Sequence, residues 1–185
     1  MNIEILKKVT MELNNTKCNW AIGGSLLLSY YGLVEEPRDI DILIDAKDSE
    51  KVKEAMDKIG ERLECKKIDL FRTEKFFRYL IDEVEVEFLG DFKIALESNE
   101  IYEFILDEKA FFTVMFGEEL MVNLSTLEDW YVAYIVMNDP KNRVPILKEY
   151  FIRNGIKHRN LIERSLNQKL PEDIKNCIKE VIDIK

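Results

Sequence analysis

Residues 20–45 read WAIGGSLLLSYYGLVEEPRDIDILID, and this stretch decides the fold. A short apolar strand at 20–22 comes first, and two glycines end it. A compact apolar helix then starts at Ser25 and stops at Gly32, because glycine commonly ends helices. A second strand follows at 39–45. The stretch therefore predicts a strand, a helix and a strand packed into one α/β unit.

Asp39 and Asp41 lie on one face of the second predicted strand, because side chains alternate along a strand. Two ionised carboxylates about 4 Å apart repel by roughly 4 kcal/mol at an effective dielectric of about 20. A divalent cation offsets such repulsion, and magnesium is typically held by one or two carboxylates together with substrate phosphates. The pair therefore indicates a metal–nucleotide site. The alternative is a half-exposed edge strand whose aspartates only meet water.

Gly23, Gly24 and Ser25 supply the second half of such a site. A strand that ends in two glycines lets a phosphate approach the backbone closely. The free N–H groups at the start of a helix favour an anion, and the Ser25 hydroxyl adds a further donor. Alone, the three residues are a weak signal, since they lack the lysine of a P-loop and the third glycine of a dinucleotide fingerprint. An ordinary tight turn is the alternative.

A third acid is expected on a later strand, because phosphoryl transfer commonly uses two metals, or one metal and a base. Residues 84–92 read VEVEFLGDF and predict a strand with Glu85 and Glu87 on one face. Either glutamate could reach the site, and Asp91 lies beyond them.

Together these motifs resemble the DNA polymerase β-like nucleotidyltransferase superfamily. Its pattern is a strand, Gly-Ser or Gly-Gly-Ser at a helix start, Asp-x-Asp on the next strand and a third acid on a later one. The match runs from about Trp20 to Phe92. More narrowly, NWAIGGS, DIDILID, TEKF and VEVEFLGDF look like a group of small bacterial and archaeal proteins of that fold. Antitoxin-like and antibiotic-modifying nucleotidyltransferases share the same core.

The resemblance implies a role for each motif. Gly24 and Ser25 would contact the triphosphate of an NTP substrate, with ATP the favoured nucleotide. The catalytic and metal-binding acids would be Asp39, Asp41 and Glu87, holding one or two Mg²⁺ ions.

Basic residues near the site would neutralise the phosphates. Lys75, in TEKF, is the favoured nucleotide contact, and Lys141 and Arg143 are weaker candidates from a later segment. Trp130 and Tyr134 are interpreted as packing against the sheet rather than stacking on a base.

The rest of the chain predicts further elements from its hydrophobic periodicity. Helices are expected at 3–15, 48–63 and 126–137, the last with Ser125 to Glu128 as a capping box, and two or three more follow Pro145. Strands are expected at 65–70, 76–81, 84–89, 110–116 and 120–124, although 110–116 is also compatible with a helix. The order predicts an α+β fold, in which helices flank a nucleotidyltransferase-type mixed β-sheet. A core at 1–124 and a helical C-terminal part at 125–185 are expected.

Composition limits the class of protein. The 185 residues are 46% hydrophobic and 34% charged, as in globular proteins, with no membrane partner expected. The net charge of −9 makes long nucleic acid an unexpected partner, because phosphate-backbone binding needs clustered lysine and arginine. The three cysteines lack disulfide or metal-ligand spacing, and the N-terminus is unlike a secretory signal. A cytoplasmic protein is expected.

Two functions are compatible with these motifs. The first is a magnesium-dependent nucleotidyltransferase that moves a nucleoside monophosphate from an NTP to a hydroxyl on a small molecule or a protein. The second is a nucleotide-binding or antitoxin-like interaction module of the same fold that has lost catalysis. Glu35 and Glu36, just before Asp39, favour the second, because they would repel a triphosphate unless they face away.

Overall fold

The computed structural model describes residues 3–35, 37, 39–65, 70–117 and 120–182. The strands are β1 (Trp20–Ile22), β2 (Ile40–Ile44), β3 (Glu61–Leu63), β4 (Lys75–Ile81), β5 (Val84–Gly90), β6 (Lys93–Ala95), β7 (Ile101–Glu103), β8 (Phe111–Phe116) and β9 (Leu120–Ser125). The helices are α1 (Ile3–Thr16), α2 (Gly24–Tyr30), the 3₁₀ turn η1 (Ala46–Asp48), α3 (Ser49–Met56), α4 (Leu127–Val136), α5 (Val144–Asn154), α6 (Arg159–Leu166) and α7 (Glu172–Lys179).

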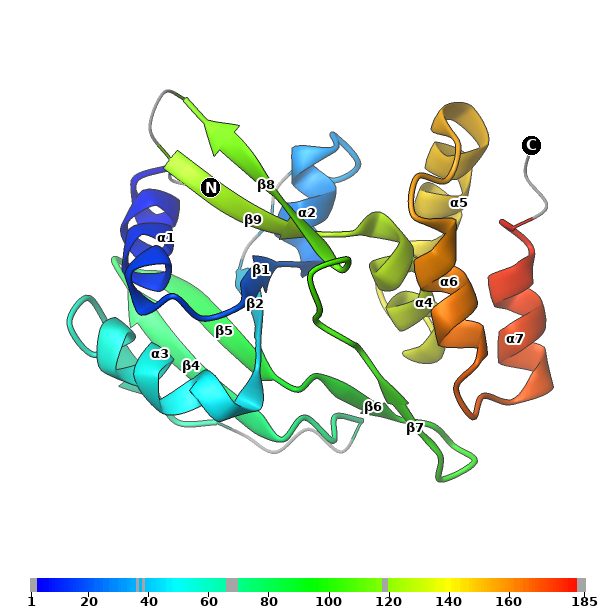
Figure 1. Cartoon of the computed structure of the whole chain (residues 1–185), viewed down its shortest axis with the longest axis horizontal. Coiled ribbons are helices and arrows are strands. Elements are labelled where there is room, and N and C mark those ends of the chain that lie inside the picture. The colour runs from blue at the N-terminus through cyan, green and yellow to red at the C-terminus, as the bar shows by residue number, and fades with distance from the viewer. Residues whose placement is uncertain (1–2, 36, 38, 66–69, 118–119, 183–185) are drawn as a thin grey trace.

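Within the described residues, one mixed sheet has the strand order β3-β4-β5-β2-β1-β9-β8, and a separate hairpin pairs β6 with β7 (Figure 1). The central strand β2 runs parallel to β5 and antiparallel to β1. Helices α1 and α3 contact each other, and α1 also contacts β9 (Figure 1). The expected α+β architecture, a mixed sheet flanked by helices, is confirmed.

The central strand separates an apolar face from a polar one. Ile40, Ile42 and Ile44 are at most 1% exposed and belong to the hydrophobic core that includes α1 and α3. Because side chains alternate along a strand, Asp41 points to the opposite face. The three isoleucines make one face of β2 entirely apolar, whereas the opposite face carries Asp41 next to the buried Leu43.

The helix expected at 48–63 is shorter than predicted. It ends at Met56, and Glu61–Leu63 form β3, which pairs with β4. Gly60 permits this close approach, since a Cβ on it would lie 2.5 Å from Cγ1 of Ile81. Pairing at the sheet edge thus overrides the helical periodicity of the segment, because tertiary contacts outweigh weak local propensities.

The remaining strand predictions have mixed outcomes. The hairpin at 76–81 and 84–89 is confirmed, and its turn residues Asp82 and Glu83 both have positive φ. Segment 110–116 is strand β8 rather than a helix, whereas β6 and β7 were not predicted. Of the strand predicted at 65–70, residues 66–69 lie outside the described residues.

The cap of α4 is displaced by one residue from the predicted capping box. Thr126 is the N-cap, and its hydroxyl accepts a hydrogen bond from the Asp129 backbone N–H. Ser125 instead donates its hydroxyl to the Ile22 carbonyl and accepts a hydrogen bond from the Trp130 indole. Glu128 is buried and accepts hydrogen bonds from two backbone N–H groups near the start of α6. Each predicted capping residue therefore has a different, tertiary role.

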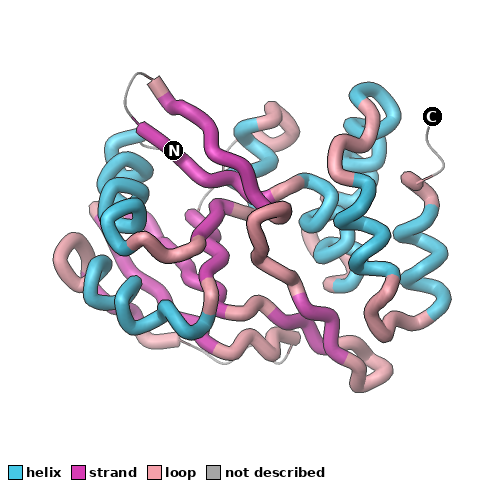
Figure 2. The backbone as a smooth tube through the Cα atoms, viewed as in Figure 1, coloured by secondary structure: helices cyan, strands magenta, loops and turns pink. Residues whose placement is uncertain are grey.

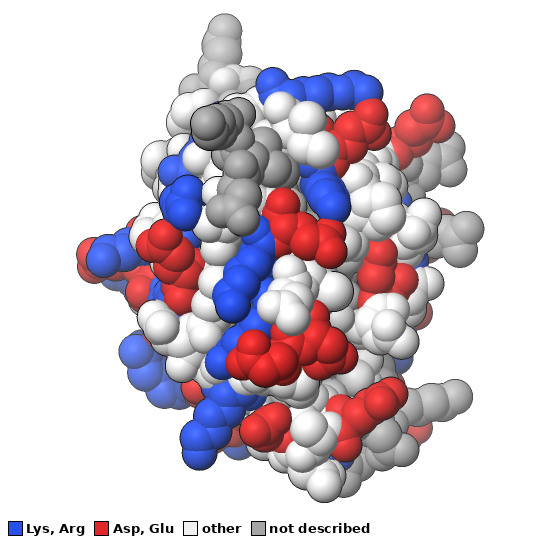
Figure 3. Space-filling model, turned by 90° about the vertical axis from the view of Figure 1, so that its right-hand side faces the viewer, with Lys and Arg blue, Asp and Glu red and all other residues white. Residues whose placement is uncertain are grey.

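Helices α4 to α7 gather on one side of the strands (Figure 2). Helix α4 follows β9 and contacts α2, α5, α6 and α7. The outer face of this group carries both charge signs side by side, with ion pairs such as Lys148–Glu180 and Arg159–Glu163 (Figure 3). No described helix is long and apolar enough to cross a membrane.

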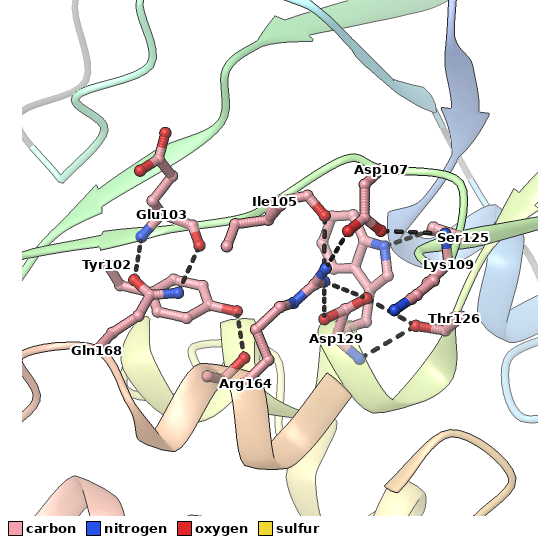
Figure 4. Close-up of polar contacts among 12 residues, drawn as sticks. Tyr102, Glu103, Ile105, Asp107, Lys109, Ser125, Thr126, Asp129, Arg164 and Gln168 are labelled. Atoms are coloured by element: carbon pink, nitrogen blue, oxygen red, sulfur yellow. Dashed lines mark hydrogen bonds and ion pairs between the residues drawn. The ribbon is translucent and has the colours of Figure 1, made fainter. Parts of the chain in front are cut away.

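Arg164 of α6 connects the helices to the strands (Figure 4). Its guanidinium donates to the Asp107 carboxylate at 2.9 Å, to the Ile105 carbonyl at 3.2 Å and to the Asp129 carboxylate at 3.2 Å. One turn further, Gln168 exchanges two hydrogen bonds with the Glu103 backbone. This clamp holds α4 and α6 in place beside the β6–β7 hairpin.

Candidate active site

The pairing of β2 with β5 brings two predicted acids together. The parallel register places Asp41 directly beside Glu87, and the antiparallel register of β4 places Arg78 on the other side of Glu87. Asp39 lies just before β2 begins. Three carboxylates from two neighbouring strands therefore share one face of the sheet.

The start of α2 lies against these acids. A Cβ on Gly24, whose φ is +56°, would lie 1.8 Å from Oδ2 of Asp41, so this close contact requires glycine. The Ser25 backbone N–H bonds the Asp41 carboxylate, and the Ser25 hydroxyl donates to Oδ1 of Asp39 at 3.3 Å. The expected glycine–serine segment and the Asp-x-Asp pair are thus in direct contact.

Gly23 has a different physical reason to be glycine. A Cβ there would lie 2.1 Å from Cζ2 of Trp130, so the indole of α4 fills the space. Gly23 does not line the cavity described below. Of Gly23, Gly24 and Ser25, the last two line that cavity.

A cavity of about 190 Å³ opens over the three acids. Its described lining combines polar with apolar and aromatic residues. The polar residues include Gly24, Ser25, Asp39, Asp41, Glu87 and Lys141, and the apolar and aromatic residues are Leu70, Phe71, Leu89, Phe92, Trp130, Tyr134, Met137 and Pro140. This combination of a broad apolar wall and a few convergent polar groups is typical of small-molecule sites.

Burial, followed by repulsion between the acids, raises the pKa of two carboxyl groups that line the cavity. Burial, together with the charges of Asp39 and Glu87, raises the pKa of Asp41 to about 7, against the weaker opposing effects of Lys141 and the Ser25 N–H. Burial also raises the pKa of Glu87, although Arg78 opposes this shift. Among the described lining residues, Lys141 is the only lysine or arginine. The negative charge of the three acids is therefore not balanced by positive charge among the described lining residues.

The donor set fits a magnesium ion held by two acids rather than three. Among the described residues, no three His, Cys, Asp or Glu side chains are arranged to hold a metal. Glu87 instead forms an ion pair with Arg78, whose Nε lies 3.3 Å from Oε1. Asp39 and Asp41 offer oxygen ligands whose mutual repulsion a cation would relieve, and magnesium commonly takes one or two carboxylates with substrate phosphates.

Lys75 lies away from the cavity. On β4 it shares a face with the buried Phe77 and Tyr79, and its charge acts on Glu50 of α3. Lys141, which follows α4, lines the cavity instead. Arg143 does not line it, although its charge reaches Tyr134.

The contribution of α4 to the cavity was not predicted from the sequence. Trp130 and Tyr134 of α4 and the C-cap residue Met137 recur at helical spacing, and all three line the cavity. Their spacing showed that they share one face of the helix, but it could not show that this face meets the acids.

Solved structures of nucleotidyltransferases share this fold. A proposed nucleotidyltransferase from Thermotoga maritima superposes with a TM-score of 0.62 at 21% identity, covering 82% of this chain and 93% of that one. The antibiotic-resistance factor ANT(2'')-Ia superposes with a TM-score of 0.56 at 12% identity, covering 96% and 91%. A structure of ANT(2'')-Ia in complex with adenylyl-2''-tobramycin gives a TM-score of 0.55 at 12% identity, covering 97% and 96%.

Sequence comparison supplies the family. No curated protein matches the chain significantly. The family profile described as aminoglycoside-2''-adenylyltransferase matches residues 5–126, which include both acidic strands and the start of α2. The chain therefore belongs to the aminoglycoside-2''-adenylyltransferase family, and its fold is that of a nucleotidyltransferase.

Proposed function

We propose that the protein is a magnesium-dependent nucleotidyltransferase that moves adenosine monophosphate from ATP to a hydroxyl of a small, cationic, aminoglycoside-like molecule. One observation carries the proposal: Asp39, Asp41 and Glu87 meet the start of α2 and Lys141 around one cavity. Family membership and the solved complex of ANT(2'')-Ia with adenylyl-2''-tobramycin support the class of acceptor. The net charge of −9 suits a cationic acceptor better than a polyanion.

In this proposal, the polar residues of the cavity hold the triphosphate. Gly24 provides a backbone donor and Lys141 a positive charge. The Ser25 N–H and hydroxyl, which bond Asp41 and Asp39, would turn to the triphosphate once the ion binds those carboxylates. The residues that would hold magnesium are Asp39 and Asp41. When bound, the ion supplies charge neutralisation for the phosphate oxygens. Glu35 is exposed and is not among the residues that line this cavity, and Glu36 lies outside the described residues.

Glu87 is the proposed proton acceptor. The acceptor hydroxyl oxygen forms a bond to the α-phosphorus, while the bond from that phosphorus to the bridging oxygen breaks. Pyrophosphate leaves with the electron pair, and the hydroxyl proton passes to the Glu87 carboxylate. The raised pKa of Glu87 strengthens it as a base relative to an ordinary glutamate. The C-terminal part, residues 125–185, contributes Trp130 and Tyr134 of α4 to the cavity lining.

The experiment is a transfer assay. The purified protein is incubated with Mg²⁺, α-labelled ATP and a panel of aminoglycosides, and labelled product and pyrophosphate are measured. A parallel reaction with γ-labelled ATP should release labelled pyrophosphate and leave the acceptor unlabelled. Label that stays in ATP with every acceptor, although the nucleotide binds, would argue against the enzyme.

One observation favours a second function, a nucleotide-binding module without catalysis. Arg78 pairs with both Glu85 and Glu87, so the proposed base is already engaged. A chain that binds Mg²⁺ and ATP tightly without transfer would support this module. Glu87→Gln distinguishes the two functions, since it should abolish turnover by the enzyme and leave nucleotide binding by the module unchanged.

A further inference from the structure

The Tyr134 hydroxyl is a polar group with no partner at the edge of the cavity. The residue lies on α4, is 5% exposed and lines the cavity. No hydrogen bond to its hydroxyl is formed within the part of the chain that the structure describes. Within the described chain, the buried side-chain atoms without a hydrogen-bond partner are Nε of Arg78 and Nε of Arg143, so the Tyr134 hydroxyl is instead accessible from the cavity. A ligand in the cavity can therefore accept a hydrogen bond from it.

The surroundings select a hydrogen-bond acceptor. Burial and then the charge of Asp41 raise the pKa of Tyr134, with Asp39 adding to the shift, so the phenol keeps its proton. Arg143 opposes the shift and Asp139 adds to it. The hydroxyl is thus a neutral donor that faces the same acids as the proposed metal–phosphate group. A phosphoryl oxygen, which only accepts hydrogen bonds, matches such a donor.

We propose that the Tyr134 hydroxyl donates a hydrogen bond to a non-bridging oxygen of the phosphoryl group that is transferred. This inference rests on the proposed function, because it places the reacting phosphorus beside Asp41. The hydroxyl would act most strongly as the α-phosphorus changes its bonding, since a donor fixed in place stabilises negative charge on those oxygens.

Tyr131, one turn earlier on α4, is a matched control. It is 1% exposed, and its hydroxyl donates to the Cys177 carbonyl at 3.1 Å, away from the cavity. Removal of the two hydroxyl groups should therefore affect stability and catalysis in opposite ways. Removing the Tyr131 hydroxyl breaks a hydrogen bond within the chain, whereas removing the Tyr134 hydroxyl breaks none that the described chain forms.

The experiment compares Tyr134→Phe with Tyr131→Phe in stability and in transfer kinetics. Tyr134→Phe should keep or raise the Tm and lower kcat by about 100-fold, with a smaller change in KM for ATP. Tyr131→Phe should lower the Tm by about 2–4 °C and leave kcat within about twofold. A Tm loss for Tyr134→Phe equal to that of Tyr131→Phe would show a structural role and overturn the inference.

Phosphorothioates identify the atom that accepts the bond. In the wild type, one diastereomer of adenosine 5′-O-(1-thiotriphosphate) should react more slowly than ATP, because sulfur accepts hydrogen bonds weakly. This slowing should shrink in Tyr134→Phe. A kcat loss that is equal for ATP and both diastereomers would place the contact elsewhere and overturn the inference.

The failures are distinguishable. A wild type that transfers no nucleotide defeats the proposed function, and this inference with it. An active wild type with an equally active Tyr134→Phe defeats the inference alone.

Discussion

Asp41 and Asp129 are two carboxylates inside the same chain, and burial raises the pKa of both, to about 7 and about 6 respectively. Their partners differ. The Asp129 carboxylate accepts hydrogen bonds from the Thr126 hydroxyl and the Arg164 guanidinium, and both lower its pKa. Asp41 has two further acids nearby and only the Ser25 N–H and the more distant Lys141 to oppose them. One carboxylate is compensated within the chain, and the other is not.

This difference separates structural from functional charge. A buried acid paired with arginine belongs to a clamp, and its loss disturbs the packing of the elements that it joins. Three acids gathered in a cavity cost stability, and no structural element is gained by their proximity. Such an arrangement is expected where a cation or a reacting group completes the site.

The largest expected effect is on catalysis. Asp41→Asn keeps the size of the side chain and removes its charge, so the proposed magnesium site loses half of its protein ligands. We expect kcat/KM for adenylyl transfer to fall by about 10³-fold or more. Asp45→Asn is the control, because Asp45 follows the same strand, pairs with Lys47 and lies outside the cavity. Equal activity of the two variants would refute the proposed role of Asp41.

The second effect is on stability. Arg164→Met removes the cation that compensates Asp129, so a buried charge is left without its partner. We expect the free energy of unfolding, measured in urea at pH 8, to fall by about 3–5 kcal/mol. The loss should shrink at pH 5, because the uncompensated Asp129 can then bind a proton. Arg159→Met, which breaks an exposed pair with Glu163, should cost less than about 1 kcal/mol.

A third effect is the pH dependence of stability that Asp41 causes. Its pKa is higher in the folded chain, about 7, than its ordinary value of 3.8. The folded state therefore holds this proton more tightly, and stability falls as the pH rises from about 4 to 7, by up to about 1.4 kcal/mol per pH unit. Asp41→Asn removes this cost.

The variant should therefore unfold at nearly the same urea concentration as the wild type at pH 4 and at a higher one at pH 8. Magnesium with a non-hydrolysable ATP analogue should narrow the difference at pH 8, since only the wild type retains both metal ligands. A difference that stays constant with pH would mean that Asp41 does not carry the cost.

The sequence predicts the acidic half of the site well. Alternation along β2 places Asp39 and Asp41 on one face, and the same rule places Glu87 on the corresponding face of β5. That β5 pairs beside β2 does not follow from either strand alone, because strand order is a tertiary property. The resemblance to nucleotidyltransferases supplied that step, and the parallel register of Asp41 with Glu87 confirms the proximity.

The sequence predicts poorly where a tertiary contact outweighs a local preference for a helix or a helix cap. Hydrophobic periodicity predicted a helix through residue 63. Periodicity reports only local spacing, so it could not show that Glu61–Leu63 would pair with β4 as strand β3. Ser125 has the spacing of a capping residue, yet its hydroxyl bonds the Ile22 carbonyl and the Trp130 indole. In both cases, a contact with a distant segment outweighs a local preference.

The last prediction concerns the cation of the cavity and has the smallest effect. Local sequence favoured Lys75, because it lies close to β5 along the chain, whereas the fold brings Lys141 to the acids from beyond α4. Lys141→Met should raise KM for ATP by about 5- to 10-fold with little change in kcat, as expected for one partly solvated charge next to a phosphate. Lys75→Met should change neither, since Lys75 lies on the α3 side of the sheet and acts on Glu50. Initial rates at varied ATP concentration measure both variants. A larger KM effect from Lys75 would mean that the triphosphate lies outside the cavity over Asp41.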